Sequence, residues 1–251
     1  MNIQVANKSS FLIFFVIFIC HYGNAKLAPD YIHPCSDTSR ECLIKATQDA
    51  IPGVVKGIPE LGVPSMDPMT FDKLTISLNN LTFNFYNGKM TGFKKCVVDN
   101  IVSLLDKRKF LLAFHCNLTL KSTYDAKGQF LLFAIDGGGD AMVKLTNLKM
   151  NLDINTKYIK DKNNIDYFSI KNYKYTFDYG DHVFFDFKNL FKGNKQLSDA
   201  VLQVLNQNWR TVVQDFGKPF LDFAVGYSVN TMKKFFHSIP YNELIYVPIP
   251  L

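Results

Sequence analysis

"KQLSDAVLQVLNQNWRTVVQDFGKPFLDFAVGYSVNTMKKFFHSIP", residues 195–240, is the stretch that decides the fold. Its apolar residues recur at helical spacing, at positions 201, 205, 209, 212, 213, 216, 220, 223, 227, 232, 235 and 236. Roughly forty helical residues would form a rod about 60 Å long, with a kink expected at Gly217–Pro219. Between Phe216 and Val229 the apolar residues are not confined to a narrow stripe, so other elements are expected to enclose the helix.

The residues that precede this helix show the two-residue period of strands. In the first such run the apolar phase changes at Asn79-Asn80, which we interpret as a β-bulge or sharp bend. It changes again between Leu145 and Leu148. Further strands are expected at 93–104, 109–120, 130–135, 142–158, 167–177 and 183–187, and turns at 105–108, 124–129, 136–140, 160–166 and 178–182. The pattern predicts an α+β fold, in which a highly curved antiparallel sheet with one apolar face wraps a long C-terminal helix.

The N-terminal residues 1–25 have the composition of a signal peptide. They carry one charge, Lys8, then an unbroken apolar run from Phe11 to Cys20, then the small residues Gly23 and Ala25. An uncleaved anchor is the alternative, but a membrane span needs about 20 apolar residues, about twice this run. We therefore expect a secreted, extracellular protein with a single domain, residues 26–251.

A short helix from 39 to 51, stopped by Pro52-Gly53, is expected near the start of this domain. The run "GIPELGVPSMDPM", residues 57–69, follows it, and its prolines exclude an interior helix or a central strand. We interpret it as a stiff strap that leads to the first long strand and lies over one end of the interior.

Four cysteines remain after the signal peptide, and an even number in an exported chain suggests two disulfides. Cys35 and Cys42 enclose six residues, so they are expected to pair across a short loop. If the chain reverses about Asp106, Cys96 lies directly opposite Cys116, as do Val98 and Phe114, and Val102 and Phe110. The predicted second disulfide is therefore Cys96–Cys116, and two free buried thiols are the alternative.

The composition and motifs argue against several functions. Without residues 1–25 the chain keeps 27 of its 28 basic residues and all 22 acidic ones, and the lysines are scattered, so nucleic acid is not an expected partner. The sequence lacks the common hydrolase, metalloprotease and phosphate-loop motifs, and its five His residues are dispersed. We expect no enzyme activity, no metal site and no cofactor.

Aromatic residues suggest instead an apolar ligand site, with ordinary core packing as the alternative for each one. The candidate lining residues are Phe83, Tyr124, Phe133, Tyr175, Trp209, Phe216, Phe220, Phe223 and Tyr227. Tyr124 or Tyr175 could hold a polar head group. The sequons at Asn80 and Asn117 are candidate glycosylation sites.

Several motifs in order resemble the takeout and juvenile hormone binding protein family over the whole mature chain. They are Cys35-x6-Cys42-Leu43, residues 57–69, "NGKMTGF" at 87–93, and the segments 118–145, 185–209 and 239–244. The resemblance implies the tubular lipid-binding fold with an elongated apolar tunnel, which carries a terpenoid hormone or a fatty-acid-like lipid. Cys96 and Cys116 depart from the family pattern together, which supports their pairing.

We therefore expect a monomeric extracellular carrier that binds a small hydrophobic ligand and touches a membrane or receptor only transiently. A protein-interaction or signalling module with a fully packed core is the alternative. Co-purifying lipid would distinguish the carrier from that alternative.

The predicted disulfides can be tested by alkylating the native secreted protein without reductant and measuring its mass. We expect no label on Cys96 or Cys116, and complete labelling of both after reduction in denaturant. A label on either residue before reduction would rule out the pairing.

Overall fold

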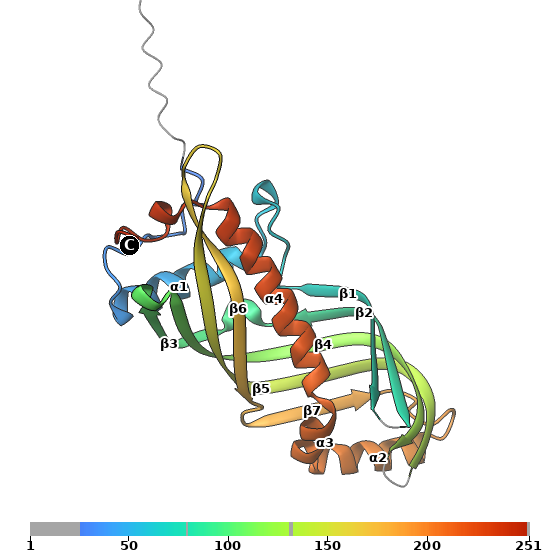
Figure 1. The fold of residues 1–251 in the computed structure, drawn as a ribbon. Helices are drawn as coiled ribbons and strands as arrows, with labels where there is room; N and C mark the ends of the chain where they lie inside the picture. Colours follow the sequence, from blue (N-terminus) through green and yellow to red (C-terminus); the bar gives the residue numbers. More distant parts are fainter. Residues whose placement is uncertain (1–25, 79, 131–132, 250–251) are drawn as a thin grey trace, which may run out of the picture.

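One antiparallel sheet of seven strands dominates the computed structural model of the chain, which describes residues 26–249 except 79, 131 and 132 (Figure 1). Two long strands, β4 and β5, pair along most of their length, and each carries two shorter strands on its outer edge. The sheet is strongly curved and does not close into a barrel (Figure 1). The strands are β1 (Met69–Leu78), β2 (Leu81–Thr91), β3 (Val97–Leu104), β4 (Lys109–Phe130), β5 (Phe133–Lys160), β6 (Asp166–Asp178) and β7 (His182–Phe187).

The C-terminal helical segment packs against this sheet, which confirms the predicted fold class, but it is not one rod. It consists of α2 (Lys195–Gln207), α3 (Trp209–Phe216) and α4 (Lys218–Ser238). Asn208 has non-helical backbone angles, and α4 starts anew after Gly217 with Pro219 in its first turn, where a proline is tolerated. The prediction of a 60 Å rod was therefore wrong. The 21 residues of α4 span about 30 Å and cross the sheet, while α2 and α3 lie at one end (Figure 1).

The first helix, α1 (Arg40–Val54), begins where the sequence predicts and ends later. The Cys42 N–H donates to the Ser39 hydroxyl, which caps the helix N-terminus. The helix continues through Pro52 to Val54, because a proline so near the C-terminus removes a single hydrogen bond. The predicted stop at Pro52-Gly53 was therefore wrong.

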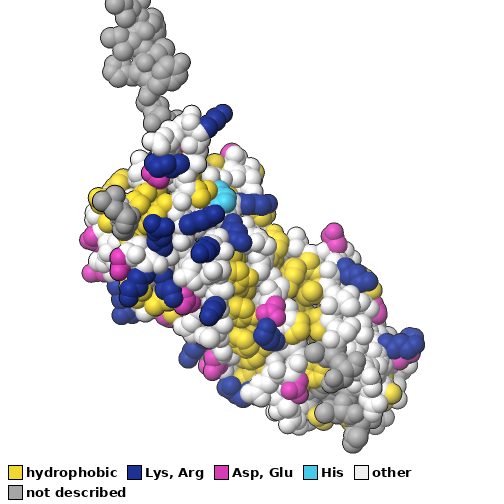
Figure 2. Space-filling view, viewed as in Figure 1, with side chains coloured by type: hydrophobic (Ala, Val, Ile, Leu, Met, Phe, Trp, Pro, Cys, Tyr) yellow, Lys and Arg dark blue, Asp and Glu magenta, His cyan; other side chains and the backbone are white. Residues whose placement is uncertain are grey.

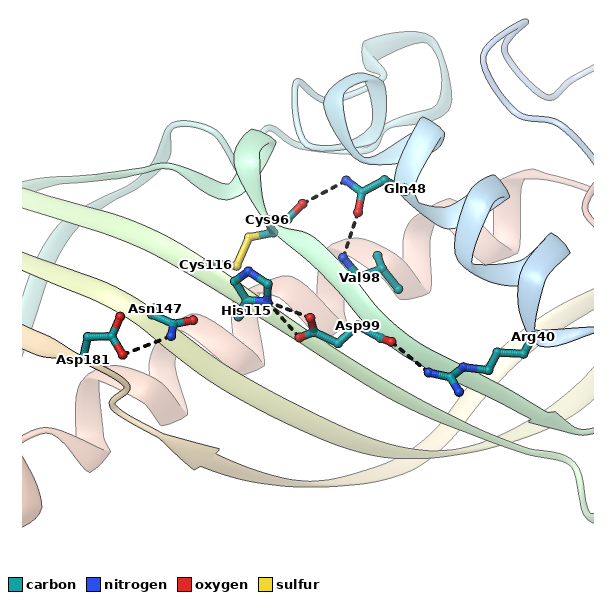
Figure 3. A network of polar contacts seen from close by, with 9 residues as sticks. All are labelled: Arg40, Gln48, Cys96, Val98, Asp99, His115, Cys116, Asn147 and Asp181. Carbon is teal, nitrogen blue, oxygen red and sulfur yellow. Dashed lines mark hydrogen bonds and ion pairs between the residues drawn. A yellow bond between two sulfur atoms is a disulfide. The ribbon is translucent and has the colours of Figure 1, made fainter.

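Polar contacts and a disulfide hold α1 and β3 on β4 (Figure 3). The Gln48 side chain donates to the Cys96 carbonyl (3.0 Å) and accepts from the Val98 N–H (2.8 Å), so its amide pairs with the free edge of β3. Cys96 is joined to Cys116 of β4, with their Cα atoms 4.4 Å apart. A second disulfide, Cys35–Cys42, closes the loop before α1.

The pairing register of β3 with β4 is as predicted only near the two cysteines. Val98 pairs with Phe114, but a β-bulge at Asp99 shifts the following residues by one position, so Val102 pairs with Leu111 and not with Phe110.

The phase change at Asn79-Asn80 marks a hairpin between β1 and β2, because Leu78 pairs with Leu81. It is not a bulge or bend within one strand. Asn79 itself lies outside the described residues.

Two predicted turns are strand interiors. Residues 124–129 lie within β4, and 136–140 lie within β5. Both assignments as turns were wrong.

Gly137 and Gly139 are explained by a second backbone segment that lies against them. Segment 188–192 runs beside this part of β5, and the Lys188 N–H donates to the Asp140 carbonyl (2.8 Å). A Cβ atom on Gly137 would lie 2.2 Å from the Leu190 carbonyl oxygen, closer than atoms pack. Glycine in a strand here permits close backbone approach.

The phase change noted between Leu145 and Leu148 is a β-bulge in the structure. Cys116 pairs with Leu148 and Leu118 with Leu145, so β5 contains one extra residue at this point. Asn147 adopts a positive φ of 58°, its N–H donates to the Asn117 side chain (2.7 Å), and its amide donates to Asp181 (Figure 3). The extra residue returns the apolar side chains on both sides of the bulge to one face.

The run 57–69 binds the far end of α4 to the sheet. Ile58, Val63 and Met66 form a buried cluster with Phe235 and Ile239 near the C-terminus of α4. The Asp67 carboxylate accepts the N–H groups of Gly92 and Lys94, just before β3.

Replacing Gly137 by Ala is expected to destabilise the fold by about 2–3 kcal/mol, because the new methyl group collides with backbone and not with a movable side chain. Urea unfolding measures this difference. Gly226→Ala is the matched control: Gly226 lies within α4 with nothing within 4 Å of its Cβ position, so the same change should stabilise by up to about 1 kcal/mol. Equal stability of the two variants would contradict the close approach.

Candidate ligand cavity

An internal cavity of about 180 Å³ lies between the sheet and the helices. The sheet wall comes from β1, β2, β4, β5 and β7, and the helical wall from α2, α3 and α4. On the helical side it reaches from Leu205 to Ser228. The part from Gly217 to Ser228 alone follows about 17 Å of α4, so the cavity is elongated along that helix.

The sheet wall is apolar because the lining residues of β4 and β5 alternate on one face. In β4 they are Phe114, Cys116, Leu118 and Leu120. In β5 they are Ile135, Val143 and Leu145 before the bulge, and Leu148, Met150 and Leu152 after it. The lining residues of β5 have odd numbers before the bulge and even numbers after it. The extra residue at the Asn147 bulge keeps all of them on one face of the sheet, so the wall is continuous.

Small residues on α4 and just before it border the space that the wall encloses. Gly217, Ala224 and Ser228 line the cavity together with Phe220, Leu221 and Val225. Large side chains at Ala224 or Ser228 would fill the interior, whereas a Cβ atom on Gly217 would lie 2.2 Å from the Tyr179 hydroxyl oxygen. On the face seen in Figure 2, apolar side chains reach the surface where α4 crosses the sheet.

The lining offers almost no polar chemistry. Among the described residues it includes no charged side chain, and its hydroxyl groups belong to Ser228 and Tyr179. The Ser228 hydroxyl donates to the Ala224 carbonyl (2.8 Å). The Tyr179 hydroxyl is buried without a hydrogen-bond partner, and burial, together with the nearby Asp222 carboxylate, raises its pKa to about 12. Such a site suits an apolar molecule with few polar atoms.

Three of the nine predicted lining residues line the cavity: Phe83, Phe216 and Phe220. Phe223 and Tyr227 lie on the neighbouring face of α4. Phe223 packs edge-on against Phe71, and the Tyr227 hydroxyl donates to the Ser65 carbonyl (2.9 Å). The Arg210 guanidinium lies over the Trp209 ring, 4.5 Å from its centre, and His182 packs edge-on against that ring. Phe133 packs against the core outside the cavity.

Neither tyrosine that we expected to hold a head group is available for that role. Tyr124 is buried among Phe83, Phe85 and Phe187, and its hydroxyl donates to the Lys188 carbonyl (2.9 Å); burial raises its pKa. The Tyr175 hydroxyl donates to the Asp222 carboxylate on the outside of α4. Burial, and to a smaller extent this hydrogen bond, raises the pKa of Tyr175. Tyr179 was not among the predicted lining residues, because it lies in "DYGDH", a segment predicted to be a turn.

Other predicted sites lie elsewhere. No residue of the run 57–69 lines the cavity, so it is not a wall of the site. Asn80 and Asn117 are exposed, and glycosylation at either stays a prediction.

Among the described residues, no metal or catalytic cluster accompanies the cavity. Within the described ranges no group of three or more His, Cys, Asp or Glu side chains could hold a metal ion. Among the described residues, the pair that most resembles a nucleophile and its base is Ser169 and His237, with Ser169 Oγ 3.0 Å from His237 Nε2. Ser169 is buried and does not line the cavity. In the part of the chain that the structure describes, no acidic side chain orients the other nitrogen of His237, as a hydrolase would need.

Comparisons with known proteins agree with this arrangement. The family model described as haemolymph juvenile hormone binding protein matches residues 12–246. The crystal structure of Takeout 1 from Epiphyas postvittana superposes with a TM-score of 0.82 at 36% identity, covering 85% of this chain and 99% of that one.

Curated relatives extend the similarity. The circadian clock-controlled protein daywake of Drosophila melanogaster is 26% identical over 260 residues, which is 96% of this chain and 98% of daywake. The juvenile hormone-binding protein of Manduca sexta is 27% identical over 90 residues, 35% of this chain.

Ala224→Phe is expected to fill the cavity, so a fluorescent apolar dye such as N-phenyl-1-naphthylamine should bind at least tenfold more weakly to this variant. Stability should fall by less than about 2 kcal/mol, since the ring enters existing space. Asn230→Phe places the same side chain on an exposed position of α4 and should leave dye binding unchanged. Equal dye affinity in both variants would place the dye elsewhere.

Proposed function

The chain belongs to the haemolymph juvenile hormone binding protein family, and from this premise we propose that it is an extracellular carrier of one small hydrophobic ligand, a terpenoid hormone or a fatty-acid-like lipid. The observation that carries the proposal is the cavity itself, which has an almost wholly apolar lining and, among the described residues, no charged side chain. The family description names binding and not catalysis, and we propose no enzyme activity.

The size and energetics of the cavity support a ligand of modest size. An apolar cavity of about 150 Å³ stays dry and binds benzene, so 180 Å³ is sufficient for an apolar guest. Burying about 300 Å² of apolar ligand surface gains about 7–8 kcal/mol before the costs of association. Met90 and Met150 in the lining have flexible side chains that can make room for a longer chain.

An extracellular location is supported by the two disulfides, which persist in oxidising compartments. We propose that residues 1–25, which lie outside the described residues, are removed as a signal peptide, and that residues 26–251 act as one monomeric domain. No described helix has the length and apolar character needed to cross a membrane. Contacts with a membrane or a receptor would then be transient and serve ligand delivery.

The alternative, an interaction or signalling module with a fully packed core, does not account for the cavity. Small residues at Gly217, Ala224 and Ser228 face a wall of large apolar side chains, which leaves the space open. A module that acts through its surface gains nothing from this void, which costs stability.

Native mass spectrometry and lipid extraction of protein secreted from a eukaryotic host test the proposal. We expect an apolar compound to co-purify, and the delipidated protein to bind it again with one-to-one stoichiometry. Ala224→Phe, purified in the same way, should carry much less of it. A delipidated protein that binds neither the extracted material nor an apolar dye would contradict the carrier function.

A further inference from the structure

Lysines that lie far apart in the sequence gather on one face of the structure. Five belong to the β5–β6 hairpin, between residues 157 and 174, and two belong to the C-terminal half of α4. On the face seen in Figure 2, Lys and Arg side chains gather over this hairpin and the adjoining end of α4. We call the seven residues the lysine face: Lys157, Lys160, Lys162, Lys171, Lys174, Lys233 and Lys234.

The hairpin and the helix are in contact at this face. His237 Nε2 lies 3.0 Å from the Ser169 hydroxyl oxygen, which joins the last turn of α4 to β6. Lys233 is four residues before His237, on the same side of the helix, and Lys171 follows Ser169 by two residues in β6. Six of the seven lysines are exposed, and Lys233 is half-buried. The lysines of the two segments therefore form one surface.

The lysine face carries the whole net charge of residues 26–251. This part of the chain has 27 basic and 22 acidic residues, a net charge of +5. Segments 157–174 and 226–240 together contain seven of these basic residues and two acidic ones, which is also +5. The remaining 20 basic and 20 acidic residues cancel. A negatively charged partner is therefore attracted to this end of the molecule.

The two acidic residues of these segments are already engaged. Asp166 pairs with Lys160 at 3.1 Å, and Asp161 accepts two backbone N–H groups within the turn of the hairpin. The other six lysines of the face have no ion pair in the part of the chain that the structure describes. Their charge is available to a partner.

Neighbouring acidic residues are engaged as well. Asp153 lies opposite Lys174 in the sheet register, but its carboxylate pairs with Lys109 at 2.9 Å. The Glu243 carboxylate, next to the hairpin, accepts two backbone N–H groups at residues 27 and 28. These acids border the lysine face without covering it.

The chemistry of the face favours an extended surface over a single anionic group. Its cations are all lysines, and none is an arginine. Arginine binds individual phosphate groups through paired hydrogen bonds, whereas lysine acts as a hydrated point charge. The charges are spread over two strands, the loop that joins them and a helix, so they can meet many separate head groups.

Apolar side chains adjoin the charges. They reach the surface where α4 crosses the sheet, on the same face as the lysines (Figure 2). A membrane that contains anionic lipid offers both negative head groups and an apolar layer below them. A nucleic acid or a sulfated polysaccharide offers only the first.

We propose that the lysine face docks this protein on membranes that contain anionic phospholipid. Each lysine near such a membrane strengthens binding about fivefold, so six unpaired lysines suffice for a reversible contact. The inference goes beyond the carrier function and does not depend on it.

The test is cosedimentation of the secreted protein with two kinds of vesicle at about 0.15 M NaCl, one of phosphatidylcholine alone and one with about 30% phosphatidylserine. The first variant replaces three exposed lysines of the face by glutamine: K162Q, K171Q and K234Q. The matched control removes the same charge from exposed positions of β2, β4 and β5: K89Q, K127Q and K144Q. A third variant has arginine at the first three positions.

The wild type should bind the phosphatidylserine vesicles at least about tenfold more tightly than the others, and about 0.5 M NaCl should abolish the difference. The glutamine variant of the face should bind them at least about tenfold more weakly, the control should change by less than about threefold, and the arginine variant should bind as the wild type does. Ala224→Phe should also bind these vesicles as the wild type does, since the filled cavity is not the docking surface.

Three results would overturn the inference. They are equal binding of the wild type to both kinds of vesicle, equal losses in the two glutamine variants, and retention on heparin–agarose without binding to either vesicle. The last result would assign the lysine face to a sulfated polysaccharide. None of them bears on the carrier function, which dye binding tests separately.

Discussion

The structure depends on one constraint: the apolar side chains of two very long strands must stay on one face from end to end. β4 and β5 pair over most of their length, and the bulge at Asn117 and Asn147 lies in the middle of the pairing. Without the extra residue, the side chains of β5 beyond it would turn to the opposite face. Asn147 fixes the bulge through its contacts with Asn117 and with Asp181, the second of which is drawn in Figure 3. A few polar groups at the surface thus determine the continuity of the wall inside.

The hollow follows from the partner that this wall meets. The helical segment breaks twice and presents glycine, alanine and serine to the sheet at several turns, where large side chains would close the gap. The strap of residues 57–69 and the Cys96–Cys116 disulfide hold the far end of α4 and the edge of β3. The strap lies outside the lining and the disulfide reaches it only at Cys116, so the framework can stay rigid while Met and Phe side chains of the wall adjust to a guest.

The sequence alone predicts the class of fold, the paired cysteines and the apolar interior, because periodicity and spacing are local signals. It fails where a distant segment determines the local structure. "DGGGD" has the composition of a turn, yet the backbone of 188–192 crosses it and needs glycine in a strand. The helical period runs through Asn208, so no pattern marks the break there, whereas Gly217–Pro219 did predict a kink where the structure has a complete helix break.

The site was harder to predict than the fold. Large aromatic residues attract attention, but six of the nine chosen pack outside the cavity, since an aromatic side chain fills space at least as often as it lines it. A better signal was the set of small residues in an otherwise bulky helix face. Tyr179 needed the structure, because its lack of a partner depends on every element around it.

The central claim is that the space beside α3 and α4 is a dry hollow that accepts apolar guests. A crystal structure of the delipidated protein under xenon pressure tests it most directly, since xenon occupies dry apolar cavities. The account predicts xenon density enclosed by Phe85, Leu148 and Leu221, and none in the Ala224→Phe variant. Wild-type crystals in which side chains close this space and xenon finds no place there would contradict it.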